Sequence, residues 1–186
     1  MNGGVELVAM VTISGHPGSG TSTLVSGLCK ALNWQMLNGG QIFRDMAEER
    51  GLTLEEFGQY CMDDESIDKQ LDEMLSNTMK SESSPEIVES RLAGWWAYKN
   101  NLTCPRVWID VSEQVRAQRV VNREGGSVDE RLIQIQDRME YDGMRYNRYY
   151  GIDINSHEPY TCIIESDNLN QNEVLDLVLQ HIGDLS

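Results

Sequence analysis

The chain has 186 residues, of which 40% are hydrophobic and 24% are charged, so it belongs with globular proteins. This length allows one domain with a sizeable core and is too short for two ordinary ones, so we expect a single domain over residues 1–186. Fifteen lysines and arginines against thirty aspartates and glutamates give a net charge of −15, which disfavours nucleic acids and anionic membranes as partners.

Short apolar runs rich in β-formers alternate with longer segments of helical pattern. The predicted strands cover residues 8–14, 34–37, 86–89, 106–111 and 160–165. The predicted helices cover residues 21–32, 41–50, 67–79, 112–123, 129–149 and 172–182. Strands that alternate with helices pair in parallel through right-handed crossovers. We therefore predict an α/β fold in three layers, built on a five-stranded parallel sheet.

Two polar helical stretches fit this sheet poorly. Residues 41–81 contain no strand pattern for some forty residues, and residues 128–150 form one long polar helix that carries arginines. We expect both to be segments outside the core that close over a ligand.

A glycine-rich turn between the first strand and the first helix is the strongest local signal. Its glycines let successive backbone N–H groups wrap a phosphate, and the start of the helix adds unpaired donors and a positive dipole end. The order of strand, glycines and helix favours this interpretation over a turn that simply caps a helix. We predict an ATP-binding P-loop made of Gly15, His16, Pro17, Gly18, Ser19, Gly20, Thr21, Ser22 and Thr23.

One position departs from the usual P-loop pattern, G-x-x-x-x-G-K-[ST]. Gly15, Gly20 and Ser22 match it, but Thr21 occupies the place of the lysine. That lysine normally puts a positive charge beside the β- and γ-phosphates, whereas Thr21 offers a hydroxyl and a backbone donor. Ser22 keeps the hydroxyl that is expected to bind Mg²⁺.

Seven arginines lie between residues 116 and 148 of this otherwise acidic chain. Two helix faces carry most of them, Arg116, Arg119 and Arg123 on one and Arg131, Arg138 and Arg145 on the other. If the second helix folds back on the first, both faces meet at one cavity and stabilise the charge of a transferring phosphoryl group. Alternatively they pair with neighbouring carboxylates at the surface, at most about 1 kcal/mol each, and Arg116 in particular could be structural.

Six short segments together carry a family resemblance that covers roughly residues 8–165. They read Gly15-His-Pro-Gly-Ser-Gly20, Asn38-Gly-Gly-Gln-Ile-Phe-Arg44, Leu52-Thr-Leu-Glu-Glu-Phe-Gly58, Ile87-Val-Glu-Ser-Arg-Leu-Ala-Gly94, Val115-Arg-Ala-Gln-Arg119 and Arg145-Tyr-Asn-Arg-Tyr-Tyr-Gly-Ile-Asp153. In this order they resemble the cytidylate kinase family, particularly its compact archaeal-type branch. The ordered set is far more specific than a P-loop alone.

The resemblance implies a P-loop kinase that transfers the γ-phosphate of ATP to CMP, and to dCMP, with Mg²⁺. It implies an NMP-binding segment near residues 39–82 and a lid near residues 123–150. It also implies a CMP site at Gly39, Arg44 and Arg91, a metal site at Ser22 and Glu89, and catalytic arginines at Arg119, Arg123, Arg138 and Arg145. Ser90 and Leu92 depart from the family pattern around Arg91, so the resemblance does not say how the base is read.

Two other functions stay open beside a CMP kinase. The chain could phosphorylate another nucleoside monophosphate or a small metabolite, or, with Thr21 for lysine, it could bind nucleotide without turnover. The retained arginines argue against a mere binder, which needs no transition-state clamp. His16 could touch phosphate or act as a spacer, and Trp95 and Trp96 are expected in the core.

The cysteine pattern and the lack of long apolar runs indicate the cellular compartment of the protein. The four cysteines are scattered, without C-x-x-C or clustered histidines, which argues against zinc and against a disulfide framework. No apolar run reaches the roughly 18 residues that a membrane span needs, and residues 1–10 show no targeting signal. We therefore expect a cytoplasmic monomer whose partners are the nucleotides ATP and CMP or dCMP.

Overall fold

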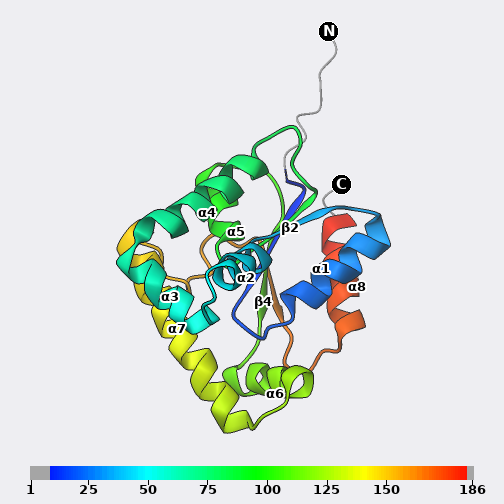
Figure 1. The fold of residues 1–186 in the computed structure, drawn as a ribbon. Coiled ribbons are helices and arrows are strands. Elements are labelled where there is room, and N and C mark those ends of the chain that lie inside the picture. Colours follow the sequence, from blue (N-terminus) through cyan, green and yellow to red (C-terminus); the bar gives the residue numbers. More distant parts are fainter. Residues whose placement is uncertain (1–8, 184–186) are drawn as a thin grey trace.

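The computed structural model describes residues 9–183, in which five strands form one parallel sheet in the order β2-β3-β1-β4-β5 (Figure 1). This confirms the predicted α/β class and parallel sheet. The strands are β1 (Val11–Gly15), β2 (Met36–Asn38), β3 (Ile87–Glu89), β4 (Arg106–Asp110) and β5 (Cys162–Glu165). The prediction started the first strand at residue 8, which lies outside the described residues.

Eight helices accompany the sheet in the described part of the chain. They are α1 (Thr21–Leu32), α2 (Gly39–Glu49), α3 (Leu54–Asp63), α4 (Glu65–Met79), α5 (Ala93–Lys99), α6 (Glu113–Glu124), α7 (Val128–Tyr150) and α8 (Gln171–Gly183). The prediction did not separate α3 from its polar surroundings and missed α5 altogether. Because the first five residues of α5 are all buried, this helix shows no amphipathic period in the sequence.

Two apolar cores, one on each face of the sheet, make the three layers. On one face α1 and α8 bring Leu28 and Val178 against β1 and β4, and Figure 1 shows these two helices side by side. On the other face α4 and α5 bring Leu75, Trp95 and Trp96 against the sheet. The expected burial of both tryptophans is confirmed, at 7% and 8% exposure.

The direction of the strands decides where a site can form. Because all five run parallel, their carboxyl ends share one edge of the sheet, where ligands of such folds bind. At this edge β1 leads into the glycine-rich loop, β3 ends at Glu89, and β2 leads into α2. Asn38 caps that helix, since its Oδ1 accepts a hydrogen bond of 2.7 Å from the Gln41 N–H.

The long helix α7 crosses this edge after packing against α6 (Figure 1). It begins at a capping box, in which the Ser127 hydroxyl and the Glu130 carboxylate each accept from the other's backbone N–H. It ends at Gly151, whose φ of 63° is the left-handed conformation that stops a helix. No described helix has both the length and the apolar character to cross a membrane, and the four cysteines are free.

Tight packing around Gly94 of α5 generates a stability prediction. A Cβ at this position would lie 2.3 Å from Tyr160 Cε1, and the Tyr160 ring itself packs in a tilted arrangement on Trp108, with centroids 4.9 Å apart, so it cannot easily move away. We expect Gly94→Ala to lower the free energy of unfolding by about 1–3 kcal/mol. Gly143→Ala, inside α7 with its nearest neighbour at 3.7 Å, should be neutral or stabilising by up to about 1 kcal/mol. Urea denaturation of the two variants checks this, and equal stability of both would contradict it.

Candidate active site

The loop between β1 and α1 has a backbone shape that only glycine accommodates well. Gly18 and Gly20 have φ of 84° and 92°, where L side chains are strained. At Gly15 a Cβ would lie 2.5 Å from Ser19 Oγ. The three glycines therefore allow the chain to turn tightly in front of the first turn of α1, as a phosphate cradle requires.

Two arginines of α6 hold this loop from behind. Arg116 is 1% exposed, and its guanidinium donates to the carbonyl oxygens of Pro17 and Val111, both at 3.1 Å. Arg119 donates to the Ser19 carbonyl at 2.8 Å and to the Ser166 carbonyl at 2.5 Å. Burial lowers the pKa of both arginines. Both bonds to the loop brace its backbone from the side of α6.

His16 in the same loop is held as a neutral ring. Its ring meets Trp108 edge to face, with the centroids 4.8 Å apart. Burial, assisted by the charges of Arg116 and Arg91, lowers the pKa of His16 to about 3. A neutral imidazole brings no charge to a phosphate, which favours the spacer role over an electrostatic one.

The residue in the place of the lysine is bound to an acid. Thr21 Oγ1 donates a hydrogen bond of 2.7 Å to Glu89 Oε1 at the end of β3. Burial raises the pKa of Glu89, while the Thr21 hydrogen bond and the charge of Arg44 oppose that shift. The other carboxylate oxygen, Oε2, is buried and has no hydrogen-bond partner within residues 9–183.

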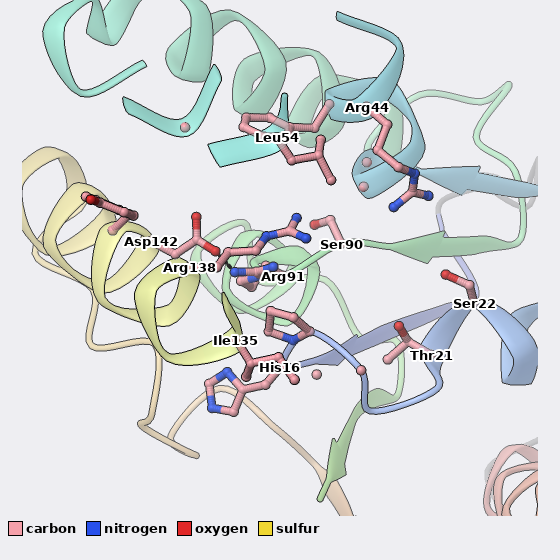
Figure 2. A pocket seen from close by; sticks show the side chains of 18 of the residues that line it. His16, Thr21, Ser22, Arg44, Leu54, Ser90, Arg91, Ile135, Arg138 and Asp142 are labelled. Atoms are coloured by element: carbon pink, nitrogen blue, oxygen red, sulfur yellow. Dashed lines mark ion pairs between the residues drawn. The ribbon is translucent and has the colours of Figure 1, made fainter. Parts of the chain in front are cut away.

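A cleft of about 660 Å³ opens in front of the loop (Figure 2). Three parts of the chain line it: the glycine-rich loop, the segment from α2 to α4, and the helices α6 and α7. Of the predicted site residues, those that line it are Gly15, His16, Pro17, Gly18, Gly20, Thr21, Ser22, Thr23, Gly39, Arg44, Glu89, Arg91, Arg123, Arg138 and Arg145. Ser19, which is buried within the loop, and Arg119, which donates to its carbonyl from α6, do not line the cleft.

A buried carboxylate, Asp142, joins two of these arginines. It is 5% exposed, forms an ion pair with Arg91 and accepts a bond of 2.9 Å from Arg145 Nη2. Burial, together with nearby Arg138, lowers the pKa of Arg91 to about 9, so the group remains charged at neutral pH. Asp142 is not among the site residues predicted from the sequence, although its i, i+3 spacing to Arg145 is a usable signal.

Two cleft arginines, Arg138 and Arg44, form no ion pair among the described residues. Among the described residues Arg138 has no ion pair or hydrogen bond, and Figure 2 shows it extending from α7 toward Ser90 and Arg91. Burial lowers the pKa of Arg138, the like charge of Arg44 adding to this. Among the described residues, Arg44 donates to the Gln41 side-chain oxygen alone, at 2.9 and 3.2 Å. Both guanidinium groups can therefore turn to an anion without breaking a buried ion pair.

The tip of the α6–α7 hairpin carries the last two cleft arginines. Arg123 and Arg131 both pair with Glu124, at 2.5 and 3.6 Å, and the side chain of Arg123 is 68% exposed. Between the two helices Gly125 and Gly126 have φ of 80° and 89°. The two helices fold back on each other, and four arginines of this hairpin line the cleft. Arg116 and Arg119 bind the loop from behind instead, so the two arginine faces do not both meet at the cavity.

A glycine-rich loop after the central strand of a parallel sheet, faced by converging arginines, defines a kinase of the P-loop class. A family model described as "Cytidylate kinase-like family" matches residues 10–168. A cytidylate kinase from Pyrococcus abyssi is 38% identical over 95% of this chain and 94% of that protein. One from Haloquadratum walsbyi is 37% identical over 91% of this chain and 86% of that protein. The chain belongs to the cytidylate kinase-like family.

Solved structures support the same fold at low sequence identity. A gluconokinase from Sinorhizobium meliloti covers 95% of this chain and 93% of its own, with a TM-score of 0.62 and 16% identity. At this identity the likeness concerns the fold, which is that of P-loop kinases.

The neutral state of His16 predicts a pH dependence of stability. Because the folded pKa of about 3 lies below the ordinary 6.5, protonation favours the unfolded chain as pH falls below 6.5. At pH 5 this should cost about 2 kcal/mol relative to pH 8. Urea denaturation at both pH values should show that loss in the parent and a smaller one in His16→Gln. Equal losses in the two proteins would contradict the assignment.

Proposed function

We propose that the protein transfers the γ-phosphate of ATP to CMP, and also to dCMP, to give the nucleoside diphosphate. Its family membership supports the reaction, since the curated relatives are named cytidylate kinases. The observation that carries the proposal is the composition of the cleft. A phosphate-binding loop lies at one side, and Arg44 and Arg91, from two separate elements, line the same cavity. A cleft with two anion sites is what a phosphoryl transfer between two nucleotides needs.

We assign the donor to the loop and the acceptor to the opposite wall. Backbone N–H groups of Gly18 and Gly20 and the start of α1 would hold the donor phosphates. Arg44 and Arg91 would hold the phosphate of CMP, because a guanidinium can donate two parallel hydrogen bonds to one phosphate. Gly39 lies between α4 and Ser90, where the acceptor approaches the backbone.

The missing lysine makes the α7 arginines more important. Thr21 donates to Glu89 and brings no positive charge, so the charge on the transferring group must be met from elsewhere. Arg138 lines the cleft without a partner of its own in the described chain, and Arg145 lies two turns further along the same face. Closure of α6 and α7 over both nucleotides would bring in these charges and exclude water.

The residues at the loop fit a nucleotide-bound Mg²⁺. Within residues 9–183 no group of three or more His, Cys, Asp or Glu side chains could hold a metal alone. Mg²⁺ in kinases, however, takes most of its ligands from phosphates and water and only one or two from protein. Two groups are suited to be these protein ligands: the hydroxyl of Ser22, which is exposed in the cleft, and Oε2 of Glu89, which has no hydrogen-bond partner in the described chain. When bound, the ion would offset charge on the β- and γ-phosphates.

The two alternatives to a CMP kinase are a kinase for another acceptor and a non-catalytic binding module. A kinase for another acceptor would need the same loop and arginines, and the substitution at Thr21 is the observation that favours a non-catalytic binding module. Arg138 argues against the module, because an arginine that is half-buried and has no partner in the described part of the chain is costly unless an anion compensates it. We propose, as expected from the sequence, that the enzyme is a monomer and that the reaction takes place in the cytoplasm.

Kinase assays with a set of nucleoside monophosphates as phosphate acceptors test the function directly. Initial rates with ATP and Mg²⁺ should be highest for CMP, with dCMP next and UMP, AMP and GMP far lower. Diphosphate formed from CMP is the product to measure. ATP binding without any diphosphate would favour the binding module, and preference for another acceptor would favour the other kinase.

Arg138→Ala should reduce turnover by a factor on the order of 10³ with little change in ATP affinity, because the charge is needed mainly in the transition state. Arg148→Ala is the matched control, since Arg148 lies on the same helix, is exposed and packs over Tyr149 at 5.8 Å. Steady-state kinetics of both variants check this. Turnover by Arg138→Ala at the rate of Arg148→Ala would rule out the role.

Ser22→Ala should lower turnover about tenfold at limiting Mg²⁺, and excess Mg²⁺ should restore part of the loss, because a ligand of the ion is gone. Ser26→Ala, an exposed serine one turn further along α1, should behave like the parent. The measurement is turnover as a function of Mg²⁺ concentration. An unchanged Mg²⁺ dependence in Ser22→Ala would show that the metal is held differently.

A further inference from the structure

A buried serine of β1 forms its side-chain hydrogen bonds with a distant part of the chain. Ser14, the residue before Gly15 of the glycine-rich loop, is 1% exposed. Its hydroxyl donates a hydrogen bond of 2.8 Å to the carbonyl oxygen of Ser90. The hydroxyl oxygen also accepts a hydrogen bond of 3.3 Å from the backbone N–H of Gly94. Because the group is enclosed in a medium of low polarity, both bonds are stronger than they would be in water.

These two partners stand at the two ends of the turn that carries Arg91. Ser90 comes directly after β3, and its carbonyl also accepts from the Ala93 N–H at 3.3 Å, which closes the turn. Gly94 lies in the first turn of α5, where backbone N–H groups have no partner inside the helix, and the N-cap residue provides no side-chain bond. The hydroxyl of Ser14 therefore holds the chain on both sides of Arg91.

This arrangement joins the two halves of the cleft through one side chain. Ser14 leads directly into the loop to which we assign the donor phosphates, while Arg91 belongs to the wall to which we assign the acceptor phosphate. Transfer requires the reacting atoms at about 3–3.5 Å with the right alignment, and a displacement of about 1 Å can cost about 100-fold in rate. A bond between the loop strand and the arginine turn is well placed to control that distance.

A neighbouring threonine shows that β1 does not need such bonds to form. Thr12 lies two residues before Ser14, hence on the same face of the strand, and is fully buried. Its hydroxyl oxygen has no hydrogen-bond partner within residues 9–183. The strand itself is held by backbone pairing with β3 and β4 on its two sides. The sheet thus does not require the bonds of Ser14, and what they fix is the turn at Arg91.

We propose that Ser14 is a positioning residue for phosphoryl transfer, which sets the distance between the donor loop and Arg91. The inference rests on the proposed function, in which Arg91 holds the acceptor phosphate. Ser14 does not line the cleft, so it acts through the backbone of the turn. Its loss should therefore affect the reaction more than the binding of either nucleotide.

Steady-state kinetics and calorimetry of Ser14→Ala test this, with Thr12→Val as the matched control. Thr12→Val also removes one buried hydroxyl from β1 and keeps the shape, so it should turn over CMP like the parent. Ser14→Ala should lower kcat for CMP about 100-fold, with the KM values for ATP and CMP changed by less than about threefold. Its stoichiometry and Kd for ATP should equal those of the parent. A merely structural role would instead lower the number of ATP sites in step with turnover, and that result would overturn the proposal.

A double-mutant cycle with Arg91→Ala tests whether Ser14 acts through that arginine. Ser14→Ala should cause almost no further loss of kcat/KM for CMP in the Arg91→Ala background, because there is no guanidinium left to position. The same loss in both backgrounds, or a Ser14→Ala variant that turns over like Thr12→Val, contradicts the inference while the proposed function stands. If the parent forms no diphosphate from CMP, the proposed function itself fails and the inference falls with it, so the two failures are distinct.

Discussion

The buried carboxylate of Asp142 allows an acidic protein to gather arginines at one place. Arg91 comes from the core beside β3, and Arg145 comes from α7, yet both bind the same side chain. Besides burial, the charges of Arg138 and Arg145 lower the pKa of Arg91, and the charge of Arg145 lowers that of Arg138, as expected for like charges held close together. One shared counterion offsets part of this repulsion and joins α7 to the sheet.

The replacement of the P-loop lysine is compatible with this distribution of charge. In the usual pattern the loop carries its own cation, whereas here the hydroxyl of Thr21 donates a hydrogen bond to Glu89. Positive charge is found instead on α2, after β3 and on α7, at Arg44, Arg91 and Arg138. Behind the loop, Arg116 and Arg119 use their charge to fix carbonyl groups of the backbone.

The sequence predicts the sheet, six of the helices and the glycine loop, because these depend on local periodicity and on backbone shape. It misses α5, whose first five residues are all buried, so that this helix shows no amphipathic period. It also misses Asp142, since its partner Arg91 lies far away in sequence. The face shared by Arg116, Arg119 and Arg123 is visible in the pattern. Which of these residues turn to the loop and which to the cleft depends on the angle between α6 and α7.

The continuous helix α7 sets a limit on how this family of sequences can vary. Arg138, Asp142 and Arg145 follow one another along a single helix without a break, so their directions are linked by the helical repeat. Loss or gain of one residue between positions 128 and 138 would turn all three by about 100° around the axis while leaving the helix intact. The turn at Gly125 and Gly126, which lies outside that repeat and touches solvent, has no such restriction. Natural variation in length should therefore collect at the turn and be absent from the helix.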